Sequence, residues 1–190
     1  ESFDNLNILN VNSASLVNGS GPLNNSGSIN INATNTLSIG TSSGTDTGSW
    51  SVGDGLILIT AGTRILNDGF SATSNTGALG ISGGTLVINT SSELLLPASL
   101  AVSLTAGTLG GGGDVAIDGG FSWSGGTMTG VGLLTTNAAS SINNPGGLTL
   151  SRDWTNAGTL TWTAGNLLLN STRSFINGGI FDASASATLT

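Results

Sequence analysis

The chain lacks cysteine and histidine, and it lacks lysine as well. Without cysteine there is no disulfide framework and no thiolate metal site, and without histidine the usual ligands of zinc and copper are missing. We therefore expect no cofactor and no metal ion. A cysteine-free secreted protein must obtain its stability elsewhere. A long ladder of backbone hydrogen bonds over stacked apolar side chains is one such source.

Positive charge is also scarce. Three arginines stand against ten acidic residues, which gives a net charge of −7. Nucleic-acid binding needs a basic stripe that displaces counterions, and an anionic membrane surface attracts basic segments. The charge balance therefore argues against nucleic acid and against anionic membranes as partners.

Long apolar runs are missing too. The densest are LILI from Leu56 and LLL from Leu94, whereas a helix needs about 20 apolar residues to span a bilayer. We expect a soluble chain without membrane insertion. Because the sequence begins at Glu1 without a methionine or a signal segment, we expect the mature or excised product of a secreted protein.

Glycine and small polar residues are abundant. Glycine supplies 31 of the 190 residues, only 7% of residues are charged, and Asn, Ser and Thr fill most other polar positions. This mixture disfavours helices and favours short strands joined by turns. The 37% of hydrophobic residues suffice for one core, so we expect a single domain over residues 1–190.

Two short motifs recur along the chain. The first is Asn or Asp, a small residue and Gly, followed by alternating apolar residues: NSGSINI from Asn25, DTGSWSV from Asp46, NTGALGI from Asn75 and NAGTLTW from Asn156. The second is an apolar residue, Ser or Thr, Ala or Gly, and then Gly, beginning at Ile59, Ile81, Leu104, Trp123 and Trp162. Its steps of 22, 23, 19 and 39 residues predict a unit of about 20 residues if the last step is double.

The period and the alternation together predict the fold. In TLTWT, Leu160 and Trp162 point to one side and the threonines to the other, as in a strand. We predict an all-β protein, a right-handed parallel β-solenoid (β-helix) with rungs of about 20 residues. Roughly nine such rungs make a rod about 43 Å long. An antiparallel sandwich or barrel is the alternative, but its hairpin repeat is shorter.

The two ends of the chain differ from its middle. Residues 1–40 are rich in asparagine and least regular, so we expect first rungs or a cap there, and regular rungs over residues 41–190. The C-terminal ASASATLT keeps a strand-like alternation, and no capping helix follows it. Solenoid ends expose strand edges that normally need protection. We therefore expect part of a longer rod, or copies that pair end to end.

One glycine-rich stretch, GGFSWSGGTMTG from Gly119, raises the question of a phosphate site. It matches the outline of a P-loop at Gly120, Gly125 and Thr127, but Gly126 stands where that motif requires lysine. The residues that follow are glycine, β-branched residues and serine, where a P-loop needs a helix. We predict that the stretch is one coil of the repeat.

The chain resembles the β-helical repeats of filamentous-haemagglutinin-like adhesins and autotransporter passengers, which are large bacterial surface proteins. The segments that carry the resemblance are NSGSINI, NTGALGI, NAGTLTWTAG and FSWSGGTMTGVGLL. The resemblance implies a secreted right-handed β-helix that serves as a stalk or an adhesive rod. It supplies no catalytic residues.

Catalysis has little support in the acidic residues. β-Helical pectinases and lyases use clustered aspartates with basic residues to act on sugar acids. Here the acids are scattered, and the closest pair of aspartates is Asp114 and Asp118. We interpret both as turn-capping residues. A calcium site is the alternative, although the register does not fit G-G-x-G-x-D and the motif does not repeat. We expect a protein that is not an enzyme.

Tryptophan can stack on sugars or fill a core. Trp154 follows Arg152 and Asp153, and the three could form a sugar-stacking patch. The favoured interpretation is a surface salt bridge between Arg152 and Asp153. The other three tryptophans occupy apolar slots of the motifs, so we expect them in the core. They are Trp50, Trp123 and Trp162.

Residues beside the inward slot of the second motif are predicted to form two columns along the rod. These are Thr60, Ser82, Thr105, Ser124 and Thr163 on one side, and Leu58, Gly80, Ser103, Ser122 and Thr161 on the other. Ice-binding solenoids resemble this in presenting flat ranks of Thr-x-Thr, but only Thr161 and Thr163 form such a pair here. The candidate surface-binding residues are Thr161, Thr163, Thr105, Thr60 and Trp154.

The leading functional hypothesis is a secreted bacterial structural or adhesive β-solenoid, a stalk or filament-forming surface protein without catalysis. The alternative is a solenoid that binds ice or polysaccharide, and a polysaccharide lyase or hydrolase ranks third. The expected partners are further copies packed end to end and a glycan or host-surface ligand.

Overall fold

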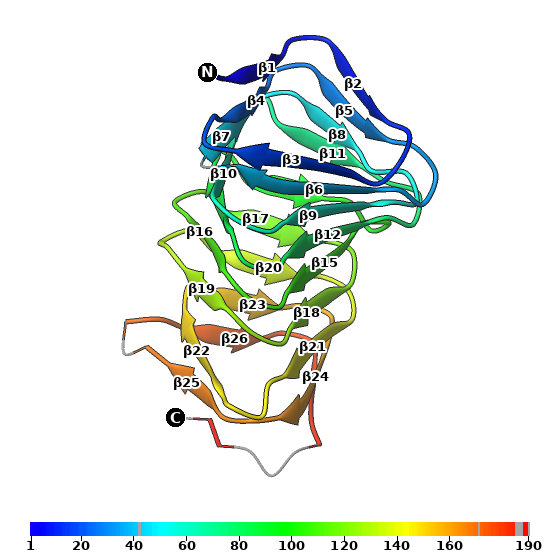
Figure 1. Cartoon of the computed structure of the whole chain (residues 1–190). Coiled ribbons are helices and arrows are strands. Elements are labelled where there is room, and N and C mark those ends of the chain that lie inside the picture. The colour runs from blue at the N-terminus through cyan, green and yellow to red at the C-terminus, as the bar shows by residue number, and fades with distance from the viewer. Residues whose placement is uncertain (42, 171, 185–187, 190) are drawn as a thin grey trace.

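The chain winds into a β-solenoid of about nine turns with about 21 residues per turn (Figure 1). This computed structural model describes residues 1–41, 43–170, 172–184 and 188–189. All regular elements within these residues are strands, and neighbouring strands pair in parallel. The predicted parallel β-solenoid is therefore confirmed.

Each turn, which we call a rung, contributes one strand to each of three faces, numbered in the order in which the chain meets them. The first face contains β1 (Phe3–Asn5), β4 (Leu23–Asn25), β7 (Ser43–Asp46), β10 (Thr63–Asn67), β13 (Thr85–Asn89), β16 (Thr108–Gly111), β19 (Thr127–Thr129), β22 (Leu148–Ser151) and β25 (Leu167–Leu169). The third face contains β3 (Ser15–Gly19), β6 (Thr36–Thr41), β9 (Leu56–Ile59), β12 (Ala78–Ile81), β15 (Ala101–Leu104), β18 (Phe121–Trp123), β21 (Ser140–Asn143), β24 (Thr159–Ala164) and β27 (Ile180–Ala183).

The second face, unlike the other two, is divided into two sheets. One sheet contains β2 (Ile8–Val11), β5 (Ser28–Ile31), β8 (Ser49–Ser51) and β11 (Ser71–Thr73). The other contains β14 (Leu94–Leu96), β17 (Val115–Ile117), β20 (Leu134–Thr136), β23 (Trp154–Asn156) and β26 (Phe175–Asn177). The two sheets lie at visibly different places around the rod in Figure 1. The ladder is thus interrupted between the fourth and fifth rungs on this face alone.

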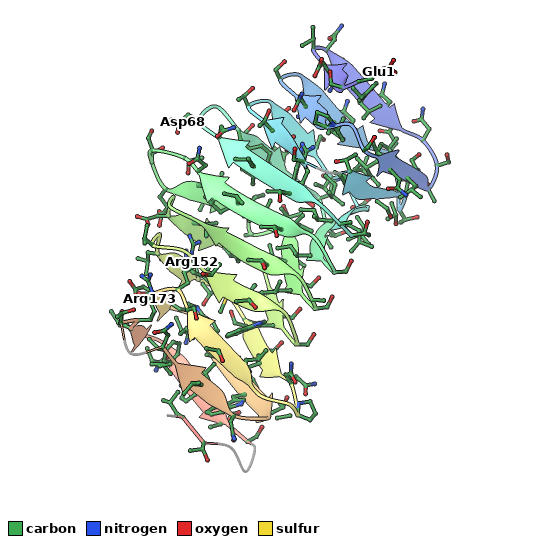
Figure 2. The ribbon with its side chains drawn as sticks, turned by 60° about the vertical axis from the view of Figure 1, so that its left-hand side comes forward. Glu1, Asp68, Arg152 and Arg173 are labelled. Atoms are coloured by element: carbon green, nitrogen blue, oxygen red, sulfur yellow. The ribbon has the colours of Figure 1, made fainter. Side chains whose placement is uncertain are left out.

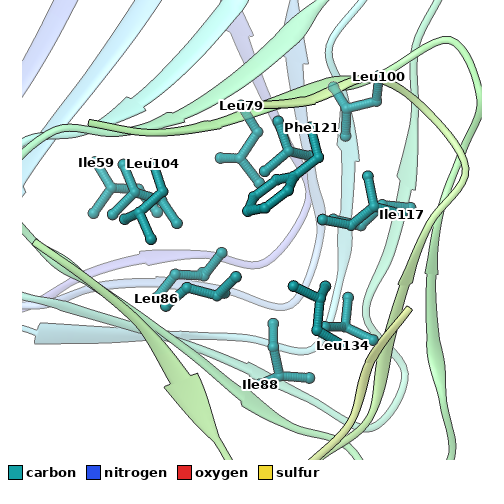
Figure 3. Packing of buried hydrophobic residues seen from close by; sticks show 14 of the residues in the cluster. Ile59, Leu79, Leu86, Ile88, Leu100, Leu104, Ile117, Phe121 and Leu134 are labelled. Carbon is teal, nitrogen blue, oxygen red and sulfur yellow. The ribbon is translucent and has the colours of Figure 1, made fainter. Parts of the chain in front are cut away.

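The core is a stack of inward side chains from alternate strand positions (Figure 3). The second motif marks one inward column of the third face, where Ile59, Ile81 and Leu104 are aligned by parallel pairing. Ile142 pairs with both Trp123 and Trp162 in this column, so it fills the position that the 39-residue step skipped. The step is double, as predicted.

Glycine is required at the corners for two different reasons. Gly107 has a positive φ of 71°, a conformation that residues with a side chain rarely adopt. Gly48 instead lies so close to the preceding rung that an added Cβ would overlap the carbonyl oxygen of Gly27. The first motif therefore marks a close approach between backbones, whereas the second motif includes left-handed turns.

The first motif also does not keep one position on the coil. Its copies at Asn25 and Asp46 end first-face strands, and the strands that follow them, β5 and β8, belong to the second face. The copies at Asn75 and Asn156 precede β12 and β24 of the third face. One local corner thus serves two edges of the rod, which explains the irregular spacing.

The stretch from Gly119 to Gly130 forms part of this ladder. It contains β18 and β19, with a turn between them that includes Gly126 (φ 71°). Residues 3–41 also pair in register with the rungs below them, in β1, β2 and β3 and then in β4, β5 and β6. The asparagine-rich start of the chain is built as rungs.

Candidate functional surface

The third face carries four of the five candidate binding residues. Thr161 and Thr163 lie within β24, Thr60 follows β9 and Thr105 follows β15. The strand pairs align Thr161 with the outward residues of the preceding rungs, so the predicted column exists. Its members are Leu58, Gly80, Ser103, Ser122, Ser141 and Thr161.

Three of these threonines bond to the protein itself. Each hydroxyl donates to the carbonyl oxygen of an inward residue one rung earlier: Thr60 to Ile39 (3.1 Å), Thr105 to Ile81 (3.4 Å) and Thr163 to Ile142 (3.3 Å). Ser82 and Ser184 make the same contact with Ile59 and Trp162. A hydroxyl that donates its one proton in this way can only accept a hydrogen bond from a ligand. The second predicted column, which includes Thr60, Ser82, Thr105 and Thr163, therefore joins successive rungs by hydrogen bonds.

An open groove of about 440 Å³ crosses the outer surface of the third face. Its floor consists of small side chains, because the outward residues that line it on four successive rungs are all Ala, Gly or Ser. Leu56 and Leu58 precede this floor along the rod, and Thr161 lies at its other end. Rungs are about 4.8 Å apart, so four of them provide a floor about 15–20 Å long.

Trp154 does not lie on this surface or on any other. Its side chain is fully buried, and its Nε1 donates to Thr136 Oγ1 at 3.0 Å. The ring packs edge-to-face against Phe121 and Phe175, with centroid separations of 5.9 and 5.3 Å. The prediction of a sugar-stacking Trp154 is wrong, because this residue fills an inward slot of β23. The other three tryptophans are buried, as predicted.

Arg152 is buried as well, so the predicted surface salt bridge with Asp153 is wrong. Its guanidinium extends toward earlier rungs and donates to the carbonyl oxygens of Gly113 (2.6 Å) and Thr129 (3.2 Å). A Cβ added at Gly132 would lie 2.8 Å from Nη2, so glycine makes room for the charge. Burial lowers the pKa of Arg152 to about 10, although Asp114 acts in the opposite direction.

Asp153 instead lies at a corner and points outward. Its Oδ1 accepts a hydrogen bond from the backbone N–H of Ser174 (2.7 Å), and its Oδ2 lies 3.7 Å from Nη1 of Arg173. Figure 2 shows Arg152 and Arg173 along the same edge of the rod. The N–H of Ser174 is the main cause that lowers the pKa of Asp153.

A second buried arginine was missed from the sequence. Arg64 forms a buried ion pair with Asp46 and donates to the carbonyl oxygen of Leu23. Trp50 Nε1 donates to the same carboxylate at 2.9 Å. Desolvation raises the pKa of Asp46, and the charge of Arg64 opposes this effect. The sequence could have indicated this, because Arg64 is two residues from the inward Leu66 in the same strand and so faces the same side.

The remaining acids near corners join successive rungs. Asp114 Oδ1 accepts from the backbone N–H of Leu133 (2.7 Å), and Asp118 Oδ1 accepts from Nδ2 of Asn137 (2.6 Å). Asp114 thus caps the backbone of the next rung rather than a turn of its own, whereas Asp118 bonds to a side chain of the next rung. Within the described ranges, no three acidic side chains gather closely enough to hold a metal ion.

No protein-family model, curated protein or solved structure matches this chain. The fold alone therefore places it, as a β-solenoid repeat protein. The part of the chain that the structure describes contains no helix that is long and apolar enough to cross a membrane.

Proposed function

We propose that this chain is a non-catalytic structural segment of a secreted bacterial surface rod, joined through its two end rungs to further rungs. One observation supports the proposal above the others. Among the residues that the structure describes, ten large apolar side chains are exposed, and eight of them lie near the ends of the rod. They are Phe3, Leu6, Ile8 and Leu16 at one end, and Leu168, Ile176, Ile180 and Leu189 at the other.

Most of these side chains occupy outward positions, where the adjacent rung carries a hydroxyl residue. At the first rung, Ile8 pairs with Ser28 and Leu16 with Ser38. At the last rung, Leu168, Ile176 and Ile180 pair with Thr149, Thr155 and Thr159. Exposed apolar side chains at one end of a molecule favour a contact with another structure there. Exposed large apolar side chains are thus concentrated at the two ends where rungs would be added.

Free backbone edges lie at the same two places. The strands β1 and β3 each begin a nine-stranded sheet, and β27 ends one, so each pairs on one side only. Leu189 continues the ladder past β25 through an isolated parallel bridge to Leu167. An unpaired edge of this kind is a template for a further strand. The resemblance to filamentous-haemagglutinin-like and autotransporter repeats favours the same role.

Negative-stain electron microscopy at several protein concentrations tests the proposal. We expect filaments one solenoid wide at high concentration, in place of discrete rods about 43 Å long. Leu16→Ser and Ile180→Thr introduce the residue types of the adjacent rungs, and we expect them to shorten the filaments. Leu95→Thr and Val131→Thr are the matched controls, because these two residues are exposed but lie in the middle of the rod. Discrete rods at every concentration would contradict assembly through the ends.

Glycan binding on the third face is a second candidate, and the groove is the observation that favours it. Its small-residue floor leaves room for an extended chain across four rungs. We expect an immobilised glycan panel to retain the protein and Ser122→Phe, which fills the groove, to abolish retention. Thr108→Phe on the first face is the control. Ice binding is the less favoured ligand, since the column mixes Leu, Gly, Ser and Thr; an ice-recrystallisation assay tests it.

A further inference from the structure

The chain contains two Asn-Gly dipeptides, and their hydrogen-bonding surroundings in the fold differ. They are Asn18-Gly19 at the end of β3 in the first rung, and Asn177-Gly178 at the end of β26 in the last. Both asparagines are exposed to solvent. An asparagine followed by glycine can modify itself, because glycine has no side chain to hinder attack by its own backbone nitrogen on the asparagine amide.

At Asn18 the reacting groups are already together. The backbone nitrogen of Gly19 donates to Oδ1 of Asn18 at 2.9 Å, so the nucleophile lies beside the carboxamide that it would attack. The space around Gly19 is open, since an added Cβ there would find no atom within 4 Å. The residue that pairs with Asn18 on the next rung is Gly40, which has no side chain. Room for a five-membered ring is therefore present.

At Asn177 the same groups are held apart by the ladder. The Gly178 N–H donates to the carbonyl oxygen of Asn156 (2.8 Å). Oδ1 of Asn177 accepts from Nδ2 of Asn156 (2.7 Å), and its Nδ2 donates to the carbonyl oxygen of Gly179 (2.9 Å). Attack at this site requires these hydrogen bonds to break first.

We propose that Asn18 is a self-modification site, at which the folded chain deamidates through a cyclic imide while Asn177 is protected. The Gly19 nitrogen loses its proton to water or base and forms a bond to Cγ of Asn18. The Cγ–Nδ2 bond breaks, and ammonia leaves. Water then opens the succinimide at either carbonyl, which yields aspartate or isoaspartate. The only co-reactant is water, and the product carries one further negative charge on the first rung.

The location gives the reaction a consequence for the surface. Asn18 lies two residues from the exposed Leu16, and it lines a small cavity of about 210 Å³ together with Glu1 and Phe3. A carboxylate at position 18 would place a charge within this apolar end. An isoaspartate would also lengthen the backbone by one methylene at the corner after β3. The first rung would therefore differ between fresh and aged protein.

Peptide mass spectrometry of the full chain after incubation at mildly alkaline pH tests the inference. Cleavage at Arg64 and Arg173 after unfolding separates the two sites into residues 1–64 and 174–190. We expect the mass shift of NH₂ to OH in residues 1–64, at a rate close to that of the chain incubated in denaturant. In residues 174–190 the folded chain should react about tenfold more slowly than the denatured chain.

Two variants identify the reacting residue. Asn18→Gln keeps an amide but requires a larger ring, so it should remove most of the shift in residues 1–64. Asn177→Gln should leave that rate unchanged. The inference is overturned if folding slows both sites equally, or if Asn18→Gln leaves the shift in place.

Discussion

Arg152 is held by backbone carbonyl groups, and no carboxylate among the described residues forms an ion pair with it. Removing a buried side chain of this kind leaves carbonyl acceptors without partners and opens a cavity. We expect Arg152→Ala to lower the free energy of unfolding by about 2–4 kcal/mol. Urea denaturation followed by circular dichroism gives this value directly.

Arg173 is the matched control for this prediction. Its ion pair with Asp153 is partly exposed and long, at 3.7 Å. Surface pairs contribute little, so Arg173→Ala should change the free energy of unfolding by less than about 0.5 kcal/mol. Equal losses for the two variants would show that the carbonyl contacts of Arg152 carry no special weight.

All four tryptophans are buried, which makes their fluorescence a test at the same scale. We expect blue-shifted emission from the native protein and weak quenching by acrylamide, a neutral quencher that the net charge of −7 does not repel. Unfolding in urea should shift the emission to the red and restore quenching. Strong quenching in the native state would mean that a tryptophan such as Trp154 is accessible after all.

At the scale of the element, corner aspartates join several rungs to the rungs that follow them, and Asp153 provides the pH test. Hydrogen bonding to the Ser174 N–H lowers its pKa in the folded protein. A depressed pKa means that the stabilisation is present above the unfolded value of about 3.9 and is lost as the pH falls through the folded value. The melting temperature should therefore decrease as the pH is lowered below about 4.

Asp153→Asn isolates this residue from Asp46, whose pKa shifts in the opposite direction. The gap in melting temperature between the wild type and Asp153→Asn should narrow as the pH falls from about 6 to about 2.5. A gap that stays constant over this range would rule out titration of Asp153 as its source.

Alternation and period were sufficient to predict the strands, the rungs and the inward column of the third face. They also contained information that the interpretation of Arg152 and Trp154 set aside, since both keep the inward parity of Leu148 and Leu150. The charged residues beside Trp154 suggested an exposed site, but the side chains of Arg152 and Trp154 follow the inward alternation of the strand. A motif of a few residues does not predict in which direction along the rod axis a long side chain, such as that of Arg64, extends.

At the scale of the whole molecule, the interrupted second face is the feature with the clearest dynamic consequence. Strands β11 and β14 lie on the second face in the fourth and fifth rungs but are not paired with one another. In the same two rungs, β10 and β13 of the first face pair over five residues. We expect backbone amides of residues 71–73 and 94–96 to exchange with deuterium faster than those of residues 63–67 and 85–89. Equal protection in all four strands would contradict this.

The break could not be predicted from local patterns, because both strands alternate normally or are simply apolar. SAT in β11 and LLL in β14 give no indication that their edges fail to meet. The displacement arises from where the chain turns before each strand, and corner geometry is set by contacts with the rung beneath. Such contacts belong to the assembled ladder rather than to a single segment.

The two buried arginines have a consequence for how the chain finds its register. A chain of similar rungs could fold with one rung skipped, and most apolar contacts would survive such a frameshift. Arg64 bonds to Leu23 and Arg152 to Gly111, each 41 residues earlier and so about two rungs back. A frameshifted chain would leave each guanidinium buried without its carbonyl acceptors, at a cost of several kcal/mol. The two buried arginines therefore favour the correct register of an otherwise repetitive coil over frameshifted ones.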